Sequence, residues 1–177
     1  MPNIDTGFPY SATPNAHVLV LGSMPSRKSL AEQQYYAHPR NAFWPIMGEL
    51  FDFDAALPYE QRLHCLCASG VALWDVAHQC IRPGSLDSDI RDVVPNNFTG
   101  FFTDCTSIHH IFFNGRKAET MYCHLVLPGL SGPWHDLPQT CLPSTSPAHA
   151  SRSFAEKLAA WKVVKEVLKQ ALETDPI

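Results

Sequence analysis

Four short apolar runs, separated by stretches of helical spacing, constrain the fold more than any other feature of the sequence. They cover residues 17–21, 71–74, 108–113 and 139–142. Strands buried on both faces are continuously apolar, and parallel neighbours need a crossover connection between them. The pattern therefore predicts an α/β protein, a three-layer α/β/α sandwich around a four-stranded parallel sheet.

Helices are predicted at residues 29–35 with Ser29 as the N-cap, at 41–53, at 58–69 and at 116–124. The last helix, 153–173, has the clearest signal. Ser153 and Glu156 form a capping-box pair. An apolar stripe at three- and four-residue steps follows it and predicts packing on the sheet; it comprises Phe154, Leu158, Trp161, Val164, Leu168 and Leu172.

The rest of the chain reads as connections within one domain spanning residues 1–177. Residues 1–15 are predicted to form an irregular N-terminal segment, here called the lead-in, which packs against the domain through Phe8 and Tyr10. Residues 78–100 read largely as loop with a helical turn near 87–91, and residues 127–138 as a proline- and glycine-rich loop. A hydrophobic content of 45% is enough for one sizeable core.

Composition argues against several classes of protein. No apolar run reaches 18 residues, and the N-terminus resembles no secretory signal, so we expect a cytoplasmic protein of bacterial or archaeal type without a membrane partner. We expect the six cysteines to be reduced thiols. Cys65 and Cys67 form a C-x-C pair without a complementary pair, so no metal and no cofactor are predicted.

The net charge of −4 speaks against a generic nucleic-acid binder, but its distribution matters more. Basic side chains follow the carboxyl ends of all four predicted strands and could form a phosphate-facing patch: Arg27, Lys28, Arg40, Arg82, Arg116, Lys117 and Arg152. Acidic residues in the same connections leave chance placement open as the alternative. They are Asp75, Asp87, Asp89 and Glu119.

Polar residues also mark these strand ends, where open α/β folds place their sites. Gly22-Ser23-Met24-Pro25-Ser26 follows the first strand, and Tyr36-Ala37-His38-Pro39-Arg40-Asn41-Ala42-Phe43-Trp44 comes soon after. Trp74-Asp75, Phe113-Asn114-Gly115 and Leu142-Pro143-Ser144-Thr145-Ser146-Pro147 end the other three strands.

These segments resemble the uracil-DNA glycosylase superfamily. Its mismatch-specific branch has a G-x-N-P-G loop followed by an aromatic-Ala-His-Pro-x-Asn-x-Phe-Trp segment, and the combination is most similar to the hypoxanthine-DNA glycosylase (deoxyinosine glycosylase) branch. Met24 and Leu142 depart from the pattern, because many relatives have a polar residue at these positions. The resemblance implies that Asn41 positions the attacking water, since a thioether cannot do so.

The resemblance also implies the other roles. Tyr36 would stack on an everted base. Base contacts would come from Gly22, Ser23, Met24, Tyr36, His38, Asp75 and Asn114. DNA contacts would come from Ser26, Arg27, Lys28, Arg40, Ser144, Thr145, Ser146 and Arg152. Structural alternatives stay open for Asn41 as a helix start, Tyr36 as a core aromatic and Asp75 as the cap of a turn.

The predicted function is a monofunctional DNA glycosylase that removes deaminated bases, hypoxanthine first and uracil second, in base excision repair. Its partners would be DNA that contains such bases and the enzymes that process abasic sites, and it would act as a monomer. One alternative is a mismatch-specific uracil or thymine glycosylase, and another is a non-catalytic DNA-binding relative. A small hydrolase is disfavoured because no G-x-S-x-G elbow is present.

Overall fold

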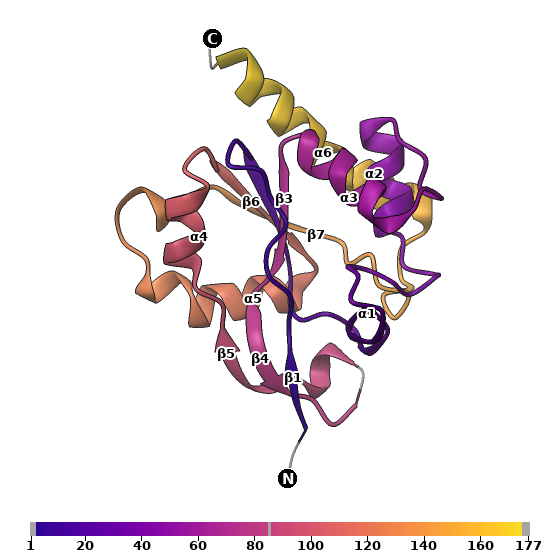
Figure 1. Cartoon of the computed structure of the whole chain (residues 1–177), viewed down its shortest axis with the longest axis vertical. Helices are drawn as coiled ribbons and strands as arrows, with labels where there is room; N and C mark the ends of the chain where they lie inside the picture. The colour runs from indigo at the N-terminus through magenta and orange to yellow at the C-terminus, as the bar shows by residue number, and fades with distance from the viewer. Residues whose placement is uncertain (1–2, 85, 175–177) are drawn as a thin grey trace.

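The computed structural model describes residues 3–84 and 86–174, so residues 1 and 2 of the predicted lead-in lie outside it. Its centre is a four-stranded parallel sheet in the order β3-β2-β6-β7, which confirms the predicted sheet (Figure 1). The strands are β2 (Val18–Gly22), β3 (Val71–Asp75), β6 (His110–Asn114) and β7 (Gln139–Leu142).

Helices cover both faces of this sheet, as the three-layer prediction requires (Figure 1). Leu19, Leu21 and Trp74 pack in one core cluster with α4 (Phe98–Asp104) and α5 (Arg116–Leu125). Val20 and Leu73 point to the opposite face because side chains alternate along a strand. They pack with α2 (Phe43–Phe51), α3 (Tyr59–Ala68) and α6 (Phe154–Thr174).

The capping box predicted for α6 is confirmed. The Ser153 amide donates to Glu156 Oε2 at 2.6 Å, and the Glu156 amide donates to Ser153 Oγ at 3.2 Å. The predicted cap of the first helix is wrong: α1 (Arg27–Glu32) begins after Ser26, whose Oγ accepts from the Ser29 amide. Ser29 lies inside the helix, where its Oγ accepts from the Ala37 amide.

A second, antiparallel sheet corrects two predictions of irregular structure. β1 (Ile4–Thr6), β4 (Ala77–Ile81) and β5 (Arg91–Pro95) pair in the order β1-β4-β5. The lead-in therefore contains a strand, and residues 78–100 hold two strands and the start of α4. These strands are solvated on one side and carry no continuous apolar run, so their sequence signal is weak. The predicted turn is present as the 3-10 helix η1 (Asp87–Asp89), and the 127–138 loop contains η2 (Leu127–Gly129) and η3 (Gly132–Trp134).

A buried ion pair joins this small sheet to the loop that follows β2. The Arg82 guanidinium, almost fully enclosed, contacts Asp5 Oδ2 at 2.9 Å and donates to the Pro25 carbonyl at 2.8 Å. Asp5 also contacts the exposed Arg27 at 3.8 Å. The charge of Arg82 is therefore neutralised inside the protein, and the prediction that it faces phosphate is wrong.

The attachment of the N-terminal segment is confirmed: the Trp74 indole donates to the Phe8 carbonyl at 3.0 Å, and Tyr10 packs edge-on against Trp74. All six cysteines are free thiols, as expected. Within residues 3–84 and 86–174, no helix is long and apolar enough to cross a membrane.

Replacing Asp5 by Asn should lower the free energy of unfolding by about 3 kcal/mol, because it leaves the buried Arg82 charge without its counter-ion. Urea denaturation measures this loss. Asp52→Asn is the matched control, since Asp52 forms an exposed pair with Lys165 at 3.8 Å and its left-handed backbone suits Asn. The control should lose less than about 1 kcal/mol. Equal losses in the two variants would show that the buried Asp5–Arg82 pair stabilises the fold no more than the exposed Asp52–Lys165 pair.

Candidate active site

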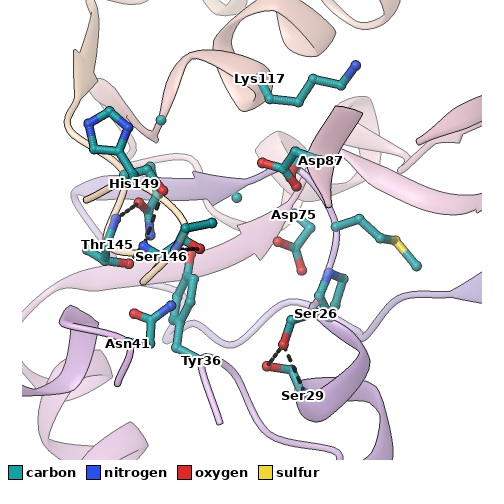
Figure 2. A pocket seen from close by; sticks show the side chains of 18 of the residues that line it. Ser26, Ser29, Tyr36, Asn41, Asp75, Asp87, Lys117, Thr145, Ser146 and His149 are labelled. Atoms are coloured by element: carbon teal, nitrogen blue, oxygen red, sulfur yellow. Dashed lines mark hydrogen bonds between the residues drawn. The ribbon is translucent and has the colours of Figure 1, made fainter. Parts of the chain in front are cut away.

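A pocket of about 330 Å³ opens at the carboxyl edge of the parallel sheet. Residues from the ends of β2, β3 and β6 and from the loops after β2 and β7 line it, and Figure 2 shows their side chains converging from different sides. The predicted residues that it brings together are Gly22, Ser23, Met24, Ser26, Tyr36, Asn41, Asp75, Asn114, Ser144, Thr145 and Ser146.

The glycine that ends β2 lets two side chains approach its backbone closely. A Cβ at Gly22 would lie 2.4 Å from Asp75 Oδ1 and 3.2 Å from Tyr36 Oη. The first distance is too short for any real contact, so only glycine permits this arrangement. The Gly22 carbonyl also accepts from the Val76 amide at 2.9 Å, which fixes the strand end against the start of β4.

Asp75 is buried at the pocket, and its Oδ2 has no hydrogen-bond partner among the described residues. Burial, with the nearby negative charge of Asp87, raises the pKa of this carboxyl to about 8, and the Arg82 guanidinium opposes the rise only in part. Asp75 is therefore mainly protonated at neutral pH. Its Oδ2 caps no backbone N–H of the described residues, so the turn-capping alternative does not account for this oxygen.

Tyr36 supplies an aromatic ring to the same pocket. Its backbone is left-handed, with φ of 54°, which is unusual for a bulky residue and indicates strain at this position. The ring packs on Phe43 with centroids 4.2 Å apart, and its hydroxyl oxygen is enclosed without a hydrogen-bond partner in the described chain. Burial, together with the Asp75 carboxyl, raises the pKa of Tyr36 well above its usual range, so the phenol stays neutral.

Asn41 lies at the start of α2 and lines the pocket beside Tyr36 (Figure 2). Its Oδ1 accepts from the Phe43 amide at 2.9 Å, so this side chain does stabilise the start of the helix, as the structural alternative holds. The bond also fixes the amide orientation, because the Phe43 N–H requires an oxygen opposite it. The Nδ2 group and the second lone pair of Oδ1 remain available to a water molecule or a ligand.

Thr145 is the centre of the loop after β7. Its amide donates to Asn114 Oδ1 and its Oγ1 accepts from Asn114 Nδ2, both at 2.9 Å. Its carbonyl accepts from the Ala42 amide at 3.0 Å. Thr145 thus joins the end of β6 to the start of α2. Asn114 is committed mainly to this joint, which leaves one N–H and part of its oxygen for the predicted base contact.

Two residues of α6, which do not line the pocket, donate hydrogen bonds to the main chain of the same loop. The buried Lys157 ammonium donates to the carbonyls of His149 and Ser146 at 2.8 and 3.4 Å. The Trp161 indole donates to the Pro143 carbonyl at 2.9 Å. These bonds are made to main-chain oxygens, so they fix the course of the loop whatever its side chains contact.

Five predicted site residues lie outside the pocket lining. His38 Nδ1 accepts from the Arg40 amide at 3.1 Å, a hydrogen bond within its own loop. Arg27 is held by Asp5 and by the Gly84 carbonyl, and Lys28 pairs with Glu32 within α1. Arg40 and Arg152 are exposed. The contacts of His38 and Lys28 are local in the sequence, whereas those of Arg27 come from distant residues that the sequence pattern does not reveal.

The pocket also contains Arg116 and Lys117, which the sequence placed in the possible phosphate-facing patch, and Asp87 and His149, which were not among the predicted contacts. Asp87 accepts from Ser23 Oγ at 2.9 Å, a contact across the two sheets without a local sequence signal. Lys117 and Arg116 begin α5 directly after Gly115, and His149 lies in the loop between β7 and α6. Their position after a strand end was the available signal. In the part of the chain that is described, no group of three His, Cys, Asp or Glu side chains could hold a metal ion.

Comparison with known proteins identifies the family. The family model of the uracil DNA glycosylase superfamily matches residues 8–168, so the chain belongs to this superfamily. The match covers the parallel sheet and the pocket together, and the resemblance predicted from the strand-end motifs is confirmed.

Two similar proteins come from species of Methanosarcina. A hypoxanthine DNA glycosylase of Methanosarcina acetivorans is 40% identical over 116 residues, which are 65% of this chain and 73% of that protein. A hypoxanthine DNA glycosylase of Methanosarcina barkeri is 34% identical over 113 residues, 63% of this chain and 72% of that protein. A solution NMR structure assigned as a uracil DNA glycosylase from Methanosarcina acetivorans superimposes with a TM-score of 0.79 at 35% identity, covering 94% of this chain and 99% of the other.

Asp75→Asn should stabilise the protein, and the gain should grow with pH. In the unfolded chain Asp75 ionises near its ordinary pKa of 3.8, whereas in the folded chain it keeps its proton up to a pKa of about 8. The parent therefore loses stability between these values as pH rises, and the neutral amide does not. Between pH 5 and pH 7 the gain in unfolding free energy should increase by on the order of 2 kcal/mol. Urea denaturation at both pH values tests this, with Asp52→Asn as a control that should show no such increase, because the Lys165 partner of this exposed carboxyl stays charged throughout the range.

Proposed function

We propose that this protein is a monofunctional DNA glycosylase that hydrolyses the N-glycosidic bond of hypoxanthine in DNA. One observation carries the proposal: a single pocket, large enough for a nucleobase, holds the Asn41 amide, the Tyr36 ring and the Asp75 carboxyl. Membership of the superfamily and similarity to two hypoxanthine DNA glycosylases support it.

Asn41 performs the water-handling step in this proposal. Breaking the N-glycosidic bond passes through an oxocarbenium-like state at C1′, which water then attacks. The Asn41 amide, anchored by the Phe43 N–H, holds that water by its free Nδ2 group and remaining lone pair. An amide is a weak base, so the rate depends on positioning the water and not on removing its proton.

Tyr36 holds the everted base. Phe43 supports one side of the phenol ring, so the ring provides a firm platform for stacking at the pocket. A base on this platform lies near Asp75, because both Tyr36 Oη and Asp75 Oδ1 surround the Gly22 backbone. Uracil is the second candidate substrate, since it shares with hypoxanthine an N–H next to a carbonyl.

The DNA backbone would contact the rim of the pocket. Arg116 and Lys117 at the start of α5 add positive charge there, and Ser144 and Ser146 offer hydroxyl groups to phosphate. The exposed side chains of Arg40 and Arg152 can extend this contact surface. No lysine is required as a nucleophile, so the product is an abasic site, which the next enzymes of base excision repair process. The protein acts on chromosomal DNA as a monomer.

Asn41→Ala should reduce the rate of hypoxanthine release by about 100-fold, because the water loses its positioning group. The measurement is single-turnover release of base from an inosine-containing duplex, with uracil and G·T duplexes as comparison substrates. Preferential release from the G·T duplex would instead favour the mismatch-specific alternative.

Asn97→Ala is the matched control. The Asn97 side chain accepts from the Gly100 amide at the start of α4 at 3.0 Å, as Asn41 accepts from the Phe43 amide at the start of α2, but Asn97 lies outside the pocket lining. Both variants should lose about 1 kcal/mol of stability, and only Asn41→Ala should lose activity. A parent protein that binds an abasic-site analogue yet releases no base would support the non-catalytic alternative.

A further inference from the structure

The position of the Tyr36 ring in the pocket depends on the main chain that carries it. Its φ of 54° is unfavourable for a bulky residue, and other backbone conformations would relieve the strain. The ring hydroxyl has no hydrogen-bond partner among the described residues, and the contact with Phe43, at 4.2 Å between centroids, is not directional. The strained backbone therefore has to be held by other groups.

Two side-chain hydrogen bonds fix the peptide groups on either side of Tyr36. The Trp44 indole donates to the Tyr35 carbonyl at 2.9 Å, which orients the peptide plane that precedes the Tyr36 Cα. The Ala37 amide donates to Ser29 Oγ at 3.1 Å, which orients the plane that follows it. Because these two planes define φ and ψ, the two bonds together impose the conformation of Tyr36.

Ser29 connects this turn to the loop after β2. It lies in α1 with only 2% of its surface exposed, and its Oγ also accepts from Ser26 Oγ at 3.1 Å (Figure 2). Ser26, the last residue of that loop, caps α1 by accepting from the Ser29 amide at 3.1 Å. The short helix α1 thus joins the loop after β2 to the Tyr36 turn through one hydroxyl group.

We propose that Ser29 is a positioning residue for base binding: its hydroxyl holds Tyr36 in the strained conformation that sets the ring for stacking before a base arrives. The inference rests on the proposed glycosylase function and deepens it, since it concerns how the stacking platform is kept ready. Ser29 also lines the pocket. Direct contact between its hydroxyl and the substrate is therefore the alternative that the test has to separate.

The strain and the hydrogen bond are of comparable size, so loss of the bond is enough to shift the conformation. A left-handed backbone at a bulky residue and one side-chain hydrogen bond change the free energy by amounts of the same order. Without the Ser29 hydroxyl, the peptide group after Tyr36 is free to rotate, and the strain favours that rotation. The ring then occupies its stacking position only part of the time, and an everted base meets its platform less often.

The first test is single-turnover release of hypoxanthine from an inosine-containing duplex at saturating protein. Ser29→Ala should slow release about fivefold, because the competent fraction of the protein falls. Its affinity for an undamaged duplex should match that of the parent, since no base is everted there. Ser69→Ala is the matched control. It removes a serine hydroxyl that donates to the Cys65 carbonyl at 2.8 Å, outside the pocket lining, and should leave the rate unchanged.

Ser29→Cys separates the hydrogen bond from the volume of the side chain. A thiol fills nearly the same space but accepts hydrogen bonds weakly, so this variant should be as slow as Ser29→Ala. A parent-like rate in Ser29→Cys would overturn the inference, because packing alone would then account for the loss in Ser29→Ala.

A double-mutant cycle with Tyr36→Ala separates positioning from direct contact. Tyr36→Ala alone should slow release by about 30-fold, because the stacking surface is lost. Adding Ser29→Ala should cost less than about twofold more, since no ring remains to be positioned. A further fivefold loss in the double variant would contradict the inference and assign the Ser29 hydroxyl to direct contact with the substrate.

A readout without catalysis keeps this inference separate from the proposed function. The NMR scalar couplings of the Tyr36 backbone depend on φ, and they should report a positive φ in the parent and in Ser69→Ala. In Ser29→Ala they should shift toward the values of a negative φ, and unchanged couplings would refute the positioning role. If the couplings shift as expected while the parent releases no base from any duplex, the glycosylase proposal fails and the role of Ser29 in holding Tyr36 stands.

Discussion

The missing side chain of Gly22 is the constraint on which the pocket depends. Asp75 and Tyr36 come from segments 39 residues apart, and they meet only because β2 ends in a residue without a Cβ. Parallel pairing of β2 with β3 sets Gly22 opposite Asp75 in register, so the sheet itself delivers the carboxyl to this place. A larger residue at position 22 would separate the acid from the phenol and fill the floor of the pocket.

The pocket is stabilised around its rim more than at its floor. At the rim, Thr145 uses its amide, hydroxyl and carbonyl to connect β6, β7 and α2. At the floor, the Asp75 and Tyr36 oxygens are enclosed without partners, and the Tyr36 backbone is strained. Such groups lower the stability of the empty protein and become favourable when a polar ligand fills the space, which is the usual relation between a preformed site and its fold.

The sequence predicted those parts of the molecule whose signal is local. Buried strands show as apolar runs and α6 shows through its cap, so the parallel sheet and the strand-end residues could be found. The small sheet could not, because β1, β4 and β5 are solvated on one side and β1 pairs with a strand far along the chain. The burial of Arg82 could not be predicted either, because its partner Asp5 is distant in the sequence. Asp87 reaches the pocket only through the tertiary contact with Ser23.

Besides packing on the sheet through its apolar stripe, α6 holds the loop after β7, which lines the pocket. The amphipathic pattern of the helix does not indicate this second role. Lys157 and Trp161 donate to three carbonyls of this loop, and neither residue lines the pocket. A substitution of Lys157 or Trp161 would therefore loosen a wall of the pocket without altering any side chain that lines it. A fusion placed after Thr174 would keep the hydrogen bonds from Lys157 and Trp161 to the loop. Truncation of the chain before Lys157 would remove them and leave the loop without this support.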